Sequence, residues 1–173
     1  MKTMGGKTVW HEIRSARMLF TQEEWGDYCE RCRQDPSERI VTSFGKYDFN
    51  DHDVCLNPDT TTIKVDDKGG YGYYVVFKLA NCGNGLWTFG LDYSTGTGGG
   101  GYSPSYATPN ETREWLKGYP SEKECKLAAC DAAIKRLDHA YHPDDPKVLR
   151  LKEMVREYKK SLSRPQVVQL SLF

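Results

Sequence analysis

The spacing of hydrophobic residues changes along the chain, with a helical period near each end and a period of two between. Four apolar residues near the N-terminus recur at helical spacing and predict a short first helix: Trp10, Ile13, Ala16 and Phe20. The next stretch, TQEE, has the features of a capping box, with Thr21 as N-cap and Glu24 three residues later. It predicts a second helix that ends before Pro36.

Between residues 38 and 94 the alternation of apolar and polar residues predicts an antiparallel sheet of about four to six strands. Its strongest signal is a long hairpin over 73–93 that turns at Asn84-Gly85. The residues expected on the buried face of this hairpin are Tyr73, Val75, Phe77, Leu79, Trp87, Phe89, Leu91 and Tyr93. The segment 94–111, rich in glycine and proline, is predicted to be a mobile loop.

After residue 120 the helical period returns. Ser121 and Glu124 form a second capping box before an apolar seam that consists of Leu127, Cys130, Ile134, Leu137 and Tyr141. Asp144 or Asp145 can cap a last helix with Pro146 at its first position, and its seam consists of Val148, Leu151, Val155, Tyr158 and Leu162. The two seams predict a helical hairpin packed on the sheet, hence a single α+β domain over 1–162 with a flexible tail over 163–173.

Composition gives no overall charge with which to attract nucleic acid or membrane, because 24 Lys and Arg balance 24 Asp and Glu. From Ser121 onward there are 11 Lys and Arg against 8 Asp and Glu, which allows only weak, salt-sensitive contact with DNA. The N-terminus lacks the apolar run of a secretory signal, so a cytoplasmic protein is expected, with its six cysteines as thiols and no disulfides.

Two short motifs have residue types that could bind a metal. The pair in CERC, Cys29 and Cys32, could form half of a zinc site, but core thiols are the favoured interpretation because both fall on the apolar side of a helix. Asp48, Asp51 and Asp53 could hold Mg²⁺ for nuclease chemistry, although a solvated turn between strands is favoured. No cofactor is expected, and no arrangement of residues establishes catalysis.

The glycine run TGTGGGG invites comparison with a phosphate-binding loop. It lacks the Lys-Ser/Thr that completes such a loop, so a flexible lid or linker is favoured. Tyr102 and Tyr106, which follow the run, could still stack on a base or sugar.

The five residues QLSLF resemble the pentapeptide with which bacterial replication and repair proteins bind the DNA polymerase III β sliding clamp. The usual form is Gln-Leu-Ser/Asp-Leu-Phe, and all five positions match: Gln169, Leu170, Ser171, Leu172 and Phe173. The resemblance implies that this segment docks, extended, into a hydrophobic cleft of the ring-shaped clamp. It covers only these residues and implies nothing about the body of the chain.

The residue types suit such docking, because an extended backbone places Leu170 and Leu172 on one side, and the Gln169 amide can fix the register at the cleft. A competing interpretation makes the segment VVQLSLF an edge strand that completes the central sheet. Deleting 169–173 distinguishes the two, since only the strand interpretation predicts loss of stability.

The sequence thus predicts a clamp-binding accessory protein of bacterial, phage or mobile-element DNA metabolism. The candidate weak DNA contacts are Arg150, Arg156, Lys159, Lys160, Arg164, Tyr102 and Tyr106. One alternative is a phage or mobile-element inhibitor of a host defence or replication factor, acting by protein–protein contact. Another is a metal-dependent nuclease that the tail delivers. No membrane partner is expected.

Overall fold

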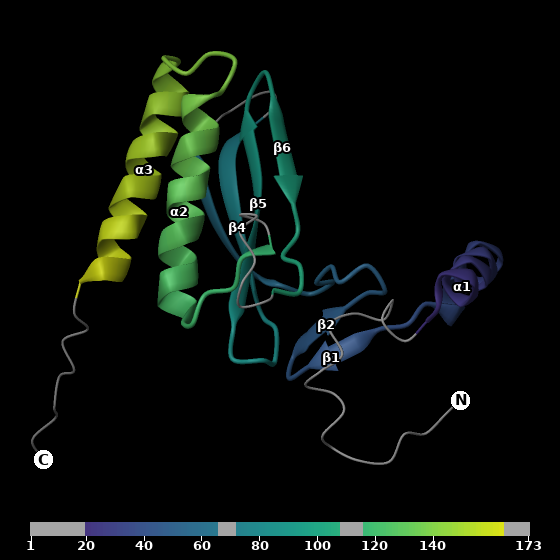
Figure 1. The fold of residues 1–173 in the computed structure, drawn as a ribbon. Coiled ribbons are helices and arrows are strands. Elements are labelled where there is room, and N and C mark those ends of the chain that lie inside the picture. The colour runs from purple at the N-terminus through teal and green to yellow at the C-terminus, as the bar shows by residue number, and fades with distance from the viewer. Residues whose placement is uncertain (1–19, 66–71, 108–115, 165–173) are drawn as a thin grey trace, which may run out of the picture.

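A computed structural model describes residues 20–65, 72–107 and 116–164. The pentapeptide 169–173 therefore lies outside the described residues, and of the helix predicted over 10–20 only Phe20 lies within them. Three helices and six strands are described (Figure 1): α1 (Gln22–Gln34), β1 (Thr42–Phe44), β2 (Tyr47–Phe49), β3 (Asp59–Val65), β4 (Tyr73–Asn81), β5 (Trp87–Thr95), β6 (Gly99–Tyr102), α2 (Glu122–Asp138) and α3 (Pro146–Ser163). The α+β class is confirmed.

Both the predicted capping box before α1 and the predicted cap of α3 are present. The Thr21 hydroxyl accepts the Glu24 N–H at 3.3 Å, and the Glu24 carboxylate accepts the Thr21 N–H at 2.8 Å. Asp145 caps α3 by accepting the Lys147 N–H at 2.7 Å, with Pro146 in the first turn. At α2, the Ser121 hydroxyl accepts the Glu124 N–H and donates to the Glu124 carboxylate. The predicted capping box differs here, because the carboxylate bonds to the Ser121 hydroxyl in place of the Ser121 N–H.

The sheet divides into two parts, where the sequence predicted one. β3, β4, β5 and β6 form an antiparallel sheet in that order, and among the described strands β1 pairs only with β2. The hairpin β4–β5 runs through nine consecutive residue pairs from Tyr73↔Thr95 to Asn81↔Trp87, and its turn contains Asn84 and Gly85, as predicted. After the hairpin β1–β2 the chain turns at residues 51–53, and Cys55 bridges back to Phe49 before β3 begins.

The helices α2 and α3 lie side by side on one face of the four-stranded sheet (Figure 1). Val75, Phe77 and Leu79 of β4 and Phe89 and Leu91 of β5 face them and are buried, which confirms the alternation of the hairpin. The helices contribute Cys125, Ala129, Cys130, Ala133, Leu137, Val148, Leu151 and Val155 to the same core. The predicted position of Tyr141 in the seam is wrong, because α2 ends at Asp138 and Tyr141 is 82% exposed.

The predicted mobile loop over 94–111 contains the fourth strand of the main sheet. Gly99–Tyr102 pairs with β5 from Ser94↔Gly99 to Leu91↔Tyr102, and Gly96 takes the positive φ of 78° that the turn requires. Glycine predicts loop because it has low strand propensity, but here pairing with β5 overrides that preference. Residues 108–111 lie outside the described part.

A second, smaller core lies beneath the hairpin β1–β2. It consists of Tyr47, Phe49, Cys55, Ala80, Cys82, Tyr106 and Ala107. Gly83 has a φ of 71°, and a Cβ there would lie 2.4 Å from the Phe44 ring that packs over it, so only glycine fits.

Candidate functional site

The end of α3 carries a basic groove beside α2. The groove is a hollow of about 540 Å³, and its lining consists of Ile134, Arg156, Lys159, Lys160, Ser163 and Arg164. The lining is mainly apolar although four of its six residues are basic, because Ile134 and the aliphatic stems of the long cationic side chains contribute to it. Four of the five basic residues predicted as DNA contacts are therefore brought together.

The basic residues at and near this groove differ in whether they form ion pairs. Lys159 pairs with Asp131 of α2, and Arg150, the fifth basic residue and outside the groove, pairs with Glu153 at 2.6 Å. Arg156, Lys160 and Arg164 form no ion pair with any residue in the described ranges, and all three are exposed. We call these three residues the α3 cation patch. Their charges are available to an anionic partner.

The chain leaves α3 in an extended conformation at the groove. Arg164, with φ −68° and ψ 138°, is the C-cap, and its N–H donates to the Ser161 carbonyl. Gln169 follows Arg164 by five positions, so the clamp-like pentapeptide is tethered close to the α3 cation patch along the sequence. The pentapeptide's own placement lies outside the described residues.

The two predicted aromatic contacts are not on an open surface. Tyr106 is only 9% exposed, packs against the rings of Phe44 and Phe49, and donates its backbone N–H to the Asp53 carbonyl. Tyr102 lies opposite Leu91 on the helix-covered face of the sheet. The sequence predicted both as free because it predicted a loop over 94–111. The prediction that Tyr106 can stack on a base is wrong, because its ring is buried.

The three aspartates proposed as a magnesium site have separate structural roles. Asp48 accepts hydrogen bonds from Ser43 and Asn57, and Asp53 sits at a positive φ of 64° in the turn. Asp51 is 4% exposed and accepts a hydrogen bond from the Tyr28 hydroxyl, with 3.0 Å between the two oxygens. Across the described ranges, no three His, Cys, Asp or Glu residues are placed to hold a metal. The predicted solvated turn is also wrong at Asp51, whose carboxylate anchors α1.

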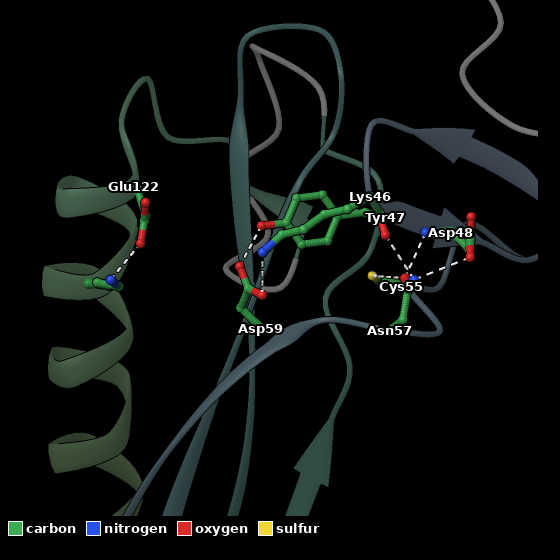
Figure 2. Close-up of polar contacts among 8 residues, drawn as sticks. Lys46, Tyr47, Asp48, Cys55, Asn57, Asp59 and Glu122 are labelled. Atoms are coloured by element: carbon green, nitrogen blue, oxygen red, sulfur yellow. Dashed lines mark hydrogen bonds and ion pairs between the residues drawn. The ribbon is translucent and has the colours of Figure 1, made fainter.

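A polar cluster that the sequence did not predict joins the hairpin β1–β2 to the start of β3 (Figure 2). Asp59 accepts a hydrogen bond from the Tyr47 hydroxyl at 2.6 Å and forms an ion pair with Lys46 at 2.6 Å. Lys46 and Tyr47 hold the pKa of the Asp59 carboxyl below its usual range, whereas burial and the bond to Asp59 raise the pKa of Tyr47. Asn57 ties the same turn to the Asp48 N–H and the Lys46 carbonyl (Figure 2).

This cluster borders a hollow of about 400 Å³ whose lining includes Phe44, Trp87, Asn81 and Glu122. Its ionisable groups already have partners, and the raised pKa keeps the Tyr47 phenol protonated, so it is not poised as a base. The sequence could not predict the contact of Lys46 and Tyr47 with Asp59, because these residues are 12 to 13 positions apart and the intervening turn brings them together.

The cysteines of CERC lie on α1, where Cys32 is buried and Cys29 is half-buried. Four other thiols, those of Cys55, Cys82, Cys125 and Cys130, are buried in the two cores. Burial raises the pKa of Cys82 and of Cys130 to about 12, so neither is a thiolate near neutral pH. These features favour the interpretation as core thiols.

No family model, curated protein or solved structure matches this chain. Of the helices in the described ranges, none has the length and apolar character needed to cross a membrane.

Proposed function

We propose that this protein is an accessory factor of DNA metabolism that a sliding clamp recruits through residues 169–173. The observation that carries the proposal is the match of all five residues, Gln169 to Phe173, to the clamp-binding pentapeptide. The end of α3 at Ser163 supports it, because the chain is already extended at Arg164, before the pentapeptide begins.

The expected affinity of the pentapeptide is modest. Burial of two leucines and a phenylalanine contributes about 5 to 8 kcal/mol before costs. Ordering five backbone residues costs about 1 kcal/mol or more each, and association adds its own entropic cost. We therefore expect a dissociation constant of about micromolar for the tail, which contacts between the body and clamp or DNA would improve.

The α3 cation patch suits a second contact with DNA held by the same clamp. Arg156, Lys160 and Arg164 have no described ion-pair partner, and each neutralised phosphate would release counterions. With the chain as a whole neutral, this contact is expected to be weak without the clamp.

The test measures binding of the full chain to a purified bacterial sliding clamp. Leu172→Ala with Phe173→Ala is expected to reduce affinity at least about 100-fold, because it removes most of the buried apolar surface. The matched control is Leu56→Ala with Leu149→Ala, which shortens two leucines exposed on the body and is expected to leave binding unchanged.

Deletion of 169–173 adds a second measurement. Loss of clamp binding with an unchanged melting temperature supports the proposal. Binding that survives the double alanine variant, or a marked drop in melting temperature on deletion, contradicts it in favour of a body surface or an edge strand.

A further inference from the structure

The strand β3 forms one edge of the main sheet, and this edge is long and regular. Its seven residues pair with β4 without interruption from Asp59↔Leu79 to Val65↔Tyr73. On its other side, none of the residues that the structure describes forms a backbone hydrogen bond with it. The outward row of N–H and C=O groups is therefore available to another strand.

β3 lacks the features that usually keep an edge strand from pairing. It has no proline and no bulge, and of the charged residues that can protect an edge it has only Asp59, at its first position, and Lys64, next to its last. Asp59 is already paired with Lys46. The opposite edge, β6, is protected by its shortness, since it has four residues of which three are glycine. β3 is thus the edge that can accept a partner.

The sequence of β3 is complementary to itself when two copies run antiparallel. A two-fold axis through Thr62 pairs all seven residues of each strand. The resulting pairs are Thr62↔Thr62, Thr61↔Ile63, Thr60↔Lys64 and Asp59↔Val65. Threonine and isoleucine are strong strand formers, and opposed threonines pair favourably. Like charges stay apart, because each Lys64 faces a threonine about 13 Å along the strand from the other Lys64.

The helix layer can accommodate this arrangement. α3 lies over β3 and β4, and α2 lies over β4 and β5, so a two-fold axis perpendicular to the sheet would place α3 beside α3 of the second copy. With strands about 4.8 Å apart, the two α3 axes would lie about 10 Å apart, the usual distance of packed helices.

The flank of α3 that would face its copy lies opposite the flank that contacts α2. Lys152 and Lys159 turn toward α2, where they pair with Asp138 and Asp131. On the opposite flank lie Met154 and Ser161, seven positions apart, which are uncharged and can approach another helix. Arg150 and Glu157 border them on the exposed side, and Arg150 is already paired with Glu153.

We propose that this protein forms a homodimer in which β3 pairs antiparallel with β3 of a second copy about Thr62. The product is a continuous eight-stranded sheet with four helices on one face. Such a dimer would carry two copies of segment 169–173, and its existence does not depend on the proposed clamp binding.

The test is sedimentation equilibrium of the full chain over about 1 to 100 μM. Wild type is expected at twice the 19.7 kDa chain mass. Thr62→Lys and Thr62→Glu each place like charges directly opposite across the axis and are expected to be monomers. Thr62 is exposed, so both variants should keep the wild-type circular dichroism.

An equimolar mixture of Thr62→Lys and Thr62→Glu is expected to restore the dimer, because lysine then faces glutamate. The control Thr97→Lys adds the same charge at an exposed turn residue and should leave the wild-type dimer intact. A folded wild-type monomer throughout the range overturns the proposal, as does a dimer that both Thr62 variants retain. A dimer that disappears on deletion of 165–173 also overturns it, since the tail would then be the pairing element.

Discussion

At the residue scale, the hydroxyl of Tyr28 links three segments of the chain. It donates to the buried Asp51 carboxylate at 3.0 Å and accepts the Ile40 N–H at 2.8 Å, and thereby ties α1 to the residues before β1 and after β2. The other Asp51 oxygen is buried and has no hydrogen-bond partner among the residues that the structure describes. The carboxylate therefore depends on this single bond.

Tyr28→Phe is expected to lower the free energy of unfolding by about 1 to 3 kcal/mol, because it leaves a buried carboxylate without its donor. Urea unfolding followed by circular dichroism measures the change. Tyr141→Phe, at a tyrosine that is 82% exposed, is the matched control and should have no effect. An equal change in both variants would show that the Tyr28 bond contributes nothing specific.

Buried phenols also make stability depend on alkaline pH. Burial raises the pKa values of Tyr28 and Tyr47 above their usual value near 10. The folded state thus favours the neutral phenols, and this stabilisation is complete below about pH 10 and declines as the pH rises toward the folded pKa values.

Wild type is accordingly expected to lose stability between about pH 10 and about pH 12, as the phenols ionise in the unfolded chain. The buried thiols add a loss of the same sign that begins lower, near their ordinary pKa of about 8.5. Combining Tyr28→Phe with Tyr47→Phe should flatten this dependence, although it lowers stability at neutral pH. Urea unfolding at both pH values provides the measurement. An unchanged slope in the double variant would assign the alkaline dependence to other groups.

At the scale of elements, replacing either of two glycines by alanine is expected to change stability in opposite directions. Gly83→Ala is expected to destabilise the β4–β5 turn by about 1 kcal/mol or more, because φ is 71° and a Cβ would lie 2.4 Å from the Phe44 ring. Gly26→Ala is expected to stabilise α1 by up to about 1 kcal/mol, since nothing lies within 4 Å. Thermal unfolding of both variants checks the signs, and a stabilising Gly83→Ala would contradict the turn geometry.

Elements with local determinants were predictable from the sequence. The caps at Thr21 and Asp145 and the alternation in the β4–β5 hairpin depend on residues within a few positions of one another, and all are confirmed. β6 was missed because its pairing with β5 is not encoded in its own glycine-rich composition. The burial of Asp51 was missed for the same reason, since its partner Tyr28 is 23 positions away.

On the scale of the whole molecule, the net charge is zero, but basic residues gather at the end of α3. The sequence predicted five basic residues as DNA contacts, and the structure separates them into two kinds. Arg150 and Lys159 are engaged in ion pairs, whereas the α3 cation patch forms none within the described ranges. The sequence predicted the helix that carries these residues, but it could not show that Lys159 is neutralised, because its partner Asp131 comes from the neighbouring helix.

This division predicts where DNA affinity arises if the clamp recruits the protein. Changing Arg156, Lys160 and Arg164 together to Gln is expected to weaken binding to a DNA-loaded clamp at low salt, with binding to free clamp unchanged. The slope of log affinity against log salt should fall by up to about 3, since about one counterion is released per phosphate contact.

The matched control removes three cations elsewhere: Arg31, Arg33 and Lys46, each changed to Gln. All three are already ion-paired within the body, far along the chain from residues 169–173. If this control lowers the salt slope as much as the patch variant does, overall charge and not the α3 cation patch governs contact with DNA. If neither variant changes the slope, the tail binds the clamp without the body touching DNA.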